Sequence, residues 1–320
     1  SRKLMFSVHV EQSLPLVYPQ VPFIMTGYEQ GFSDRSSSII KADADYEVVA
    51  KISKFIDKPQ HHYFLILRNI HNNRLNMIER KEYKHSTETY GYAYDNTVLD
   101  NLDLTFEVPR GEMLRRSTAY DPENNPMNSV NLLATYVATD VTMEDSIWIS
   151  ETAKNKLSSV LYKKVVVNIN DNDILLNLMG DENHYKSFPM VGEKVKGGIL
   201  CAVRREKIED SLFAQSVEML QKILMSDDKY TPGDNGEVID IDIHCNNPDI
   251  LRDRYSNSQV WYVYNDHLRF INEFVVTVNR LMKKYNLTHK DLEYGLGATF
   301  YEFTRELNGA QFRNQKVYSG

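Results

Sequence analysis

The sequence predicts an α+β protein with a β-rich, barrel-like first part, a β-rich second part and a helical C-terminal tail. Three observations predict this class. Short runs of β-branched and aromatic residues, separated by Gly, Asp and Asn, fill residues 1–155. Glycines interrupt further apolar runs over residues 156–250, and apolar residues recur at helical spacing over residues 251–320. With 320 residues the chain is long enough for one to three domains. We expect the domain boundaries near residues 155 and 250.

The strands expected in the first part are short and apolar. Gly111 is placed to permit a turn within the last of them, because glycine adopts positive φ without steric cost. The runs are VPFIMTGY (21–28), SSSIIKADADYEVVAKIS (36–53), HYFLILRNI (62–70), RLNMIERKEY (74–83) and LTFEVPRGEML (104–114).

The second part combines strands with one amphipathic helix. Strands are expected at VLYKKVVVNIN (160–170) and GEVIDIDI (236–243), around a hairpin punctuated by Gly192, Gly197 and Gly198. Between them, residues 211–225 (SLFAQSVEMLQKILM) predict a helix from their apolar spacing. The apolar positions are Leu212, Val217, Leu220, Ile223 and Leu224.

The tail, residues 251–320, predicts two helices. Residues 267–286 (HLRFINEFVVTVNRLMKKYN) carry an apolar stripe. Thr288 offers an N-cap for a second helix, with Asp291 three residues later. The stripe consists of Leu268, Ile271, Phe274, Val275, Val278, Leu281 and Met282.

Composition restricts the classes of function. The formal net charge is −7, whereas an autonomous nucleic-acid binder presents an excess of Lys and Arg. The charge therefore favours a component of an assembly. Two cysteines are too few for a disulfide framework or a thiolate zinc site, which fits a reducing cytosol. The nine His residues show no zinc-ligand spacing, and His61 and His62 are interpreted as a surface pair. No apolar run approaches the ~20 residues that cross a bilayer, so no membrane partner is expected.

Two adjacent acidic residues, Glu144 and Asp145, are the candidate catalytic residues. They follow a hydrophobic run and precede the apolar, strand-like Ile147, Trp148 and Ile149. Neighbouring carboxylates repel each other and lose hydration on burial, so a cation such as Mg²⁺ often compensates them. The alternative is a solvated acidic turn, since structural pairs show the same pattern.

The context of this pair resembles the β (second-largest) subunit of multisubunit DNA-dependent RNA polymerases. Residues 144–151 (EDSIWISE) resemble the end of that family's GYNFEDAILISE segment. Residues 1–16 (SRKLMFSVHVEQSLPL) resemble NRALMGANMQRQAVPL, and residues 22–29 (PFIMTGYE) resemble PLVGTGME. Residues 189–200 (PMVGEKVKGGIL) and 232–243 (PGDNGEVIDIDI) resemble P.VGE.V..GDIL and PNGVSGTVIDVQV. All five segments follow the family's order.

The resemblance implies roles for particular residues. Asp145 would contact a second Mg²⁺, directly or through water, with Glu144 as its electrostatic neighbour. Arg2 would reach the triphosphate of the incoming nucleotide, because a guanidinium matches phosphate oxygens two at a time. Gln12 would touch the growing RNA end.

The resemblance also implies a division of the chain. Residues 1–155 would bind the RNA–DNA hybrid, and residues 156–250 would form the flap or wall, followed by the helical tail. In the family the flap-tip helix binds an initiation factor, which assigns Leu220, Ile223 and Leu224 to a promoter-specificity (sigma-like) factor. The alternative is that this apolar stripe packs against its own domain.

Expected partners follow from what the chain lacks. It has no Asp-Phe-Asp-Gly-Asp sequence, so the catalytic Mg²⁺ would be held mainly by the largest (β′) subunit or its fragments. The resemblance begins at the first residue, so the upstream part of a β subunit would be left out of this sequence, processed away or encoded elsewhere; in the last case the remaining β fragment or fragments are further expected partners. This pattern resembles the split polymerase subunits of giant bacteriophages, and the expected compartment is the cytoplasm, the host's if the protein is viral. DNA template, RNA and nucleoside triphosphates complete the expected partners. The alternative class is a non-enzymatic scaffold of a viral assembly.

Overall fold

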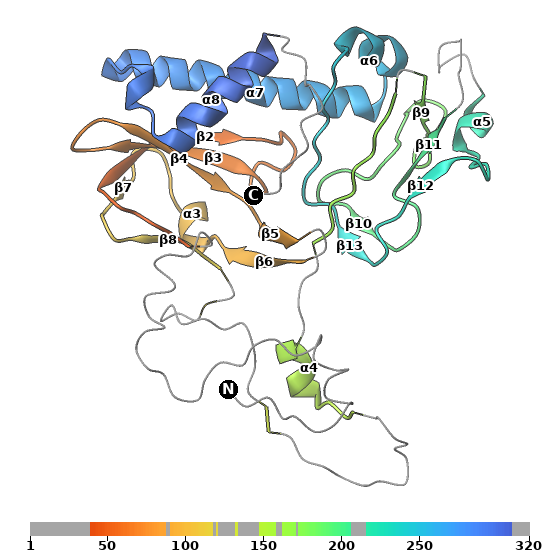
Figure 1. The fold of residues 1–320 in the computed structure, drawn as a ribbon, viewed down its shortest axis with the longest axis horizontal. Helices are drawn as coiled ribbons and strands as arrows, with labels where there is room; N and C mark the ends of the chain where they lie inside the picture. Colours follow the sequence, from red (N-terminus) through yellow and green to blue (C-terminus); the bar gives the residue numbers. More distant parts are fainter. Residues whose placement is uncertain are drawn as a thin grey trace. The chain divides into compact units, whose positions relative to one another are not determined.

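The structure, a computed structural model, describes residues 39–87, 90–117, 120, 132–133, 147–157, 162–170, 172–205 and 216–308 (Figure 1). The fold is α+β, as predicted, with a curled, half-barrel sheet and a helical C-terminal region. Two compact units alternate along the chain, whereas the sequence predicts three consecutive segments. The first unit is Ser1–Asp43, Tyr83–Asn101 and Gly111–Tyr162; the second is Ala44–Glu82, Leu102–Arg110 and Lys163–Gly320.

The first unit contains a four-stranded antiparallel sheet. In spatial order its strands are β1 (Ile40–Lys41), β8 (Met113–Ser117), β6 (Tyr90–Asp95) and β5 (Tyr83–Thr87). Leu99, from the short helix α3 (Thr97–Asp100), and Leu114 of β8 are buried in this unit. The Arg115 guanidinium lies 4.0 Å from the centre of the Tyr94 ring, a cation–π distance. Gly111 has φ +91°, which confirms the turn predicted there.

The larger sheet of the second unit also has four antiparallel strands. In spatial order they are β4 (Leu75–Arg80), β3 (Tyr63–Asn69), β2 (Tyr46–Ser53) and β7 (Glu107–Val108). Strand β3 is inside the sheet, and its first five residues are all buried. A strand that is covered on both faces reads as a continuous apolar run, as YFLIL does, whereas β2 alternates between buried and less buried positions.

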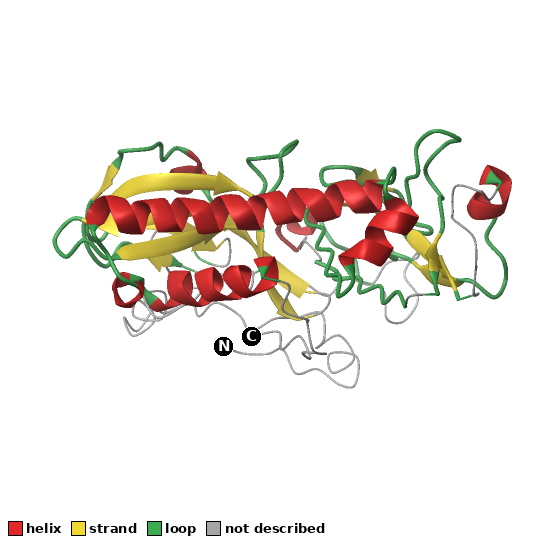
Figure 2. Ribbon diagram, turned by 90° about the horizontal axis from the view of Figure 1, so that it is seen from above, coloured by secondary structure: helices red, strands yellow, loops and turns green. Residues whose placement is uncertain are grey.

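Two helices of the tail pack on this sheet (Figure 2). They are α7 (Gln259–Tyr285) and α8 (Tyr294–Leu307). The Phe64 ring of β3 lies 5.3 Å from Phe270 and 5.7 Å from Phe274, both on α7. The Phe303 ring of α8 lies 5.1 Å from Phe274. The predicted tail helix is therefore confirmed, and its apolar stripe lies in the core. Of that stripe, Ile271, Phe274, Val278, Leu281 and Met282 are buried, and Leu268 and Val275 are partly buried.

Helix α7 ends in a left-handed cap. Asn286 has φ 54° and ψ 48°, a conformation that Asn tolerates better than most residues. Its N–H donates to the Lys283 carbonyl at 3.4 Å, and the Leu287 N–H donates to the Met282 carbonyl at 2.8 Å. This is the Schellman pattern, and Leu287 supplies its hydrophobic contact by packing against the core.

The second tail helix starts later than the sequence predicts. Thr288 and Asp291 form the predicted capping box, but it closes only the 3₁₀ turn η3 (His289–Asp291). The Glu293 N–H then donates to the Leu75 carbonyl at 2.8 Å, so the chain bonds to β4 before α8 begins at Tyr294.

A smaller β module completes the second unit. Its core includes Leu175, Tyr185, Val203 and Tyr255. The elements are a three-stranded sheet of β12 (Asp228–Tyr230), β11 (Cys201–Arg204) and β9 (Ile174–Leu175), a pair of β10 (Lys194–Val195) with β13 (Gly236–Glu237), and the helices α5 (Val217–Gln221) and α6 (Pro248–Tyr255).

Two strand predictions for this module are wrong in extent. Residues 162–170 alternate in exposure but form no strand, and β13 covers only the first two residues of GEVIDIDI. A strand requires a hydrogen-bonded neighbour, and alternation alone does not provide one. Lys163 instead contacts the chain through its side chain, donating to the carbonyls of Thr231 and Pro232 at 3.2 and 3.0 Å.

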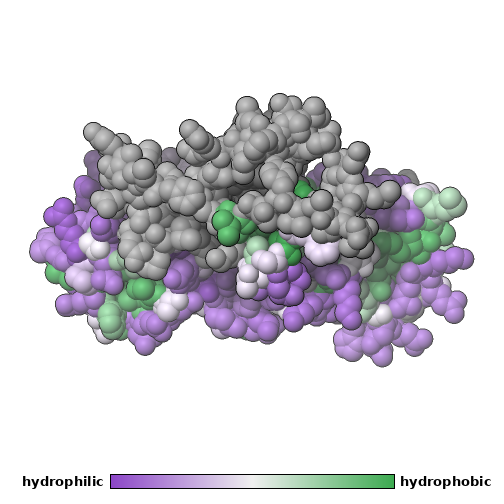
Figure 3. All heavy atoms as spheres, turned by 90° about the horizontal axis from the view of Figure 1, so that it is seen from below, coloured by the Kyte–Doolittle hydropathy of each residue, from purple (hydrophilic) through white to green (hydrophobic). Residues whose placement is uncertain are grey.

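Figure 3 shows one face of the molecule, on which the coloured surface is mostly hydrophilic. On the face shown in Figure 3, apolar patches are separated by hydrophilic side chains. Among the helices that the structure describes, none has the length and apolar character needed to span a bilayer.

Candidate functional site

The residues predicted to bind nucleotide, RNA and metal lie outside the described residues. These are Arg2, Gln12, Glu144 and Asp145. Their roles stay predictions. The segment directly after the acid pair is described, and Ile147, Trp148 and Ile149 form no strand there, contrary to expectation. All three side chains are exposed. The chain then enters α4 (Glu151–Leu157), where the Ser150 hydroxyl accepts the Ala153 N–H at 3.2 Å.

The three predicted factor-binding residues differ in their surroundings. Leu220 is 4% exposed and belongs to the core of the small β module. Ile223 is partly buried, and Leu224 is 36% exposed. The helix expected over residues 211–225 ends at Gln221, and residues 211–215 lie outside the described part. Among the three predicted residues, Leu224 alone is exposed, and it lies next to the fully exposed Met225.

A buried arginine binds backbone carbonyls at the C-terminal end of α5. The Arg204 guanidinium pairs with both oxygens of Asp227 at 3.0 and 2.9 Å, and it also donates to the carbonyls of Met219 and Lys222. The Arg204 and Asp227 side chains are 4% and 1% exposed. Burial alone would raise the pKa of Asp227, but Arg204 and the Leu224 N–H outweigh it, so the pKa is lowered. The ion pair therefore stabilises the turn after α5, because Arg204 binds the Lys222 carbonyl and Asp227 accepts the Leu224 N–H.

Residues 189–200 and residues 232–243 are hydrogen-bonded to each other. The Gly192 N–H donates to the Val238 carbonyl at 2.7 Å, and the Val238 N–H donates to the Glu193 carbonyl at 3.0 Å. In the adjoining ladder Lys194 is opposite Glu237. Gly192 has φ +84°, which the turn before β10 requires and which glycine supplies without strain. Residues 189–200 and 232–243 are thus one antiparallel unit.

A charged cluster connects the second of these segments to the larger sheet. Lys54, at the end of β2, is 7% exposed, and its Nζ lies 2.7 Å from an oxygen of Asp240 and 2.7 Å from one of Asp242. Side chains two residues apart in an extended chain share a face, which brings both carboxylates to Lys54. On the other side of Asp240, the buried His62 lies 2.7 Å from Glu79.

The neighbouring charges shift the pKa values of the groups in this cluster. Burial lowers the pKa of Lys54 and of His62, but the neighbouring carboxylates outweigh it and raise both. The same contacts hold the pKa of Asp240 well below its usual range. The interpretation of His61 and His62 as a surface pair is therefore wrong for His62, which is 7% exposed.

A cavity of about 340 Å³ lies beside this cluster. Residues from the 189–200 and 232–243 segments line it, together with charged groups of both signs and residues of α7. The lining residues are Lys54, Phe55, Asp57, Lys58, Met190, Val191, Gly192, Glu193, Ile241, Tyr262, Val263, Asp266 and His267.

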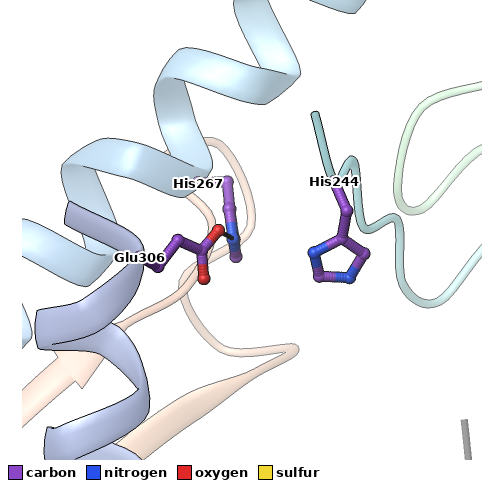
Figure 4. A group of neighbouring side chains, drawn as sticks. All are labelled: His244, His267 and Glu306. Carbon is purple, nitrogen blue, oxygen red and sulfur yellow. Dashed lines mark hydrogen bonds and ion pairs between the residues drawn. The ribbon is translucent and has the colours of Figure 1, made fainter. Parts of the chain in front are cut away.

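One group of side chains in the described part of the chain has the composition of a metal site. His244, His267 and Glu306 offer ligand atoms that all lie within 4.8 Å of one another. Figure 4 shows His267 of α7 and Glu306 of α8 joined by a hydrogen bond, with the His244 ring beside them. That hydrogen bond is 3.1 Å long. The sequence gives no signal for this group, because His244 lies in a loop and His267 and Glu306 lie on two different helices, 39 residues apart.

The chain matches no protein-family model, and no curated protein matches its sequence.

Proposed function

We propose that this chain is part of a β-type subunit of a DNA-directed RNA polymerase. It would form one wall of the active centre, hold the RNA–DNA hybrid and the incoming nucleotide, and border the RNA exit path with a flap. The observation that carries the proposal is the occurrence of five family-like segments in the family's order, from residue 1 to residue 243.

The described residues add support at two of these segments. Residues 189–200 and 232–243 resemble the family independently, yet they pair through Gly192, Glu193 and Val238. Chance similarities scattered along a chain would have no reason to be hydrogen-bonded neighbours. The second segment also contributes Asp240 and Asp242, whose carboxylates form ion pairs with the buried Lys54.

The net charge of the chain indicates that it would bind nucleic acid only together with partner chains. At −7 it lacks the cationic surface that supplies most nucleic-acid affinity, so the basic surface would come from partner chains. These partners would be the largest subunit, the remaining β fragments and a sigma-like factor, in the cytoplasm of a bacterium or of a phage-infected host. As a nucleotidyltransferase subunit, the chain would be active only with the largest subunit. Its own residues would orient the substrate: Arg2 at the triphosphate, Gln12 at the RNA end, and Glu144 with Asp145 beside the second Mg²⁺.

Purification of the native complex tests the assignment. A mass-spectrometric inventory should find a chain carrying Asp-Phe-Asp-Gly-Asp at equal stoichiometry, since the catalytic Mg²⁺ requires those aspartates. Structural proteins of a viral particle in its place would favour the scaffold alternative and refute the proposal.

Substitution of the acid pair tests the chemistry. Asp145→Ala in the reconstituted polymerase should slow nucleotide addition strongly while assembly is retained, because the second Mg²⁺ loses a ligand or a bound water. Asp249→Ala serves as the control, since Asp249 lies at the start of α6 in a described, exposed position. Equal addition rates for the two variants across a range of Mg²⁺ concentrations would contradict the role of Asp145.

A further inference from the structure

We infer that His244, His267 and Glu306 form a binding site for one divalent transition-metal ion of the zinc class. Two imidazoles and a carboxylate are a ligand set that zinc takes in proteins, commonly with a fourth position left to water. Nitrogen ligands also favour Zn²⁺, Co²⁺ and Ni²⁺ over Mg²⁺, which prefers oxygen. The site is therefore distinct in chemistry from the Mg²⁺ of the proposed polymerase reaction, and it does not depend on that proposal.

Two of the three ligands are already close to coordinating positions. Nε2 of His267 and Oε1 of Glu306 are 3.1 Å apart. Two ligand atoms that each lie about 2.0–2.1 Å from a tetrahedral ion are separated by about 3.3 Å. An ion could thus enter between them with little movement of α7 or α8. Both side chains are about nine-tenths buried, so the pair is largely removed from competing water.

The third ligand is on a segment that can approach. His244 is exposed and lies between β13 and α6, and its ring centre is 6.0 Å from that of His267. Because all three ligand atoms lie within 4.8 Å of one another, closing the site requires a shift on the order of 1.5 Å. The exposed His244 side also supplies the route by which an ion and its water reach the buried pair.

The His267 ring has a further nitrogen that the described residues leave unused. Its Nδ1 is buried and has no hydrogen-bond partner among them. The imidazole is therefore bonded at one nitrogen only, in a side chain that also borders the 340 Å³ cavity. An ion bound at Nε2 would replace only the hydrogen bond to Glu306, so coordination breaks no hydrogen bond at Nδ1.

Binding would connect three parts of the second unit. His244 follows the segment that provides Asp240 and Asp242, His267 is on α7, and Glu306 is in the last turn of α8. An ion held by all three would fasten the end of α8 and the 232–243 segment to α7. The expected role is structural, because the ion stabilises the folded arrangement that forms its site.

Metal titration of the full, untagged chain tests the inference. Calorimetry with Zn²⁺ and absorption spectroscopy with Co²⁺ should show one ion bound per chain. His244→Ala should weaken binding at least about tenfold, as loss of a ligand must cost no less than loss of a supporting residue. Since His244 is exposed, this substitution should leave the fold intact.

A matched control separates the site from general histidine affinity. His184 is 82% exposed and lies 3.1 Å from Asp181, so it offers the same chemical groups on the surface. His184→Ala should bind Zn²⁺ as tightly as the native chain, whereas Glu306→Gln should bind it weakly. In hydrogen exchange, Zn²⁺ should slow opening of the last turn of α8 in the native chain and not in His244→Ala. Absence of stoichiometric binding, or equal affinity of the native chain and His244→Ala, would overturn the inference.

Discussion

Replacement of Arg204 by Met is expected to destabilise the small β module more than any exposed charge substitution. Met fills much of the volume of the arginine stem but leaves Asp227 without its two guanidinium hydrogen bonds. It also leaves the carbonyls of Met219 and Lys222 without their donor. The remaining charge on Asp227 would be almost completely buried, because that side chain is 1% exposed.

The expected loss follows from this burial. Removing one partner of a buried ion pair costs about 3–5 kcal/mol, whereas exposed pairs contribute about 0–1 kcal/mol. Arg252 provides the matched control, because its partners Asp249 and Asp253 are 80% and 73% exposed. A free-energy change of 1.4 kcal/mol corresponds to a tenfold change in an equilibrium constant. A loss of about 3 kcal/mol therefore raises the equilibrium constant for local opening, and lowers amide protection, by roughly 150-fold.

Hydrogen exchange measures this loss locally. The amides of β11 and β12 should lose at least about a hundred-fold of protection in Arg204→Met and less than about fivefold in Arg252→Met. The double variant Arg204→Met, Asp227→Asn should recover part of the protection, because it buries no unpaired charge. Equal protection of the Arg204→Met and Arg252→Met variants would refute the reasoning, and so would a double variant that is no better protected than Arg204→Met alone.

Three further outcomes are expected. The pKa of His62 is raised above its ordinary 6.5, so its contribution to stability is complete below that pH and is lost as the pH rises through the folded-state pKa; urea titrations should show this slope, and His62→Gln should remove it. Leu220→Ala should cost about 2–5 kcal/mol in thermal unfolding because Leu220 is in the core, while Leu224→Ala should leave stability within about 0.5 kcal/mol and is the better test of factor binding. Gly180→Ala should destabilise the fold by about 1–3 kcal/mol, because its Cβ would meet the His184 carbonyl oxygen at 2.0 Å; an unchanged melting temperature would contradict that packing.

The sequence predicts the elements that have a strong local signal. The apolar run YFLIL and the stripe from Leu268 to Met282 are long or periodic enough to indicate a buried strand and an amphipathic helix, and both are present. The capping box at Thr288 is also correct, because it depends on residues three positions apart. Residues 162–170 show the limit of such reasoning, since their strand-like alternation has no paired neighbour.

For the candidate sites, too, the sequence predicts what depends on local motifs and misses what depends on packing. The roles of Glu144, Asp145, Arg2 and Gln12 are predicted from resemblance to the family's sequence motifs. No pattern indicates that His62 is buried among carboxylates, or that Leu220 is in a core while Leu224 is exposed. Burial depends on which distant segment covers a residue, and short-range spacing carries no information about that.

The α+β class, the amphipathic tail, the acidic net charge and the order of the family-like segments can all be read from the residues alone. These properties depend on residue type and on spacing within one or two turns. The pairing of Lys54 with Asp240 and Asp242, and the approach of His244, His267 and Glu306 to one another, come from the packed fold. Contacts between residues so far apart along the chain depend on how helices and strands pack, and packing is a property of the whole core.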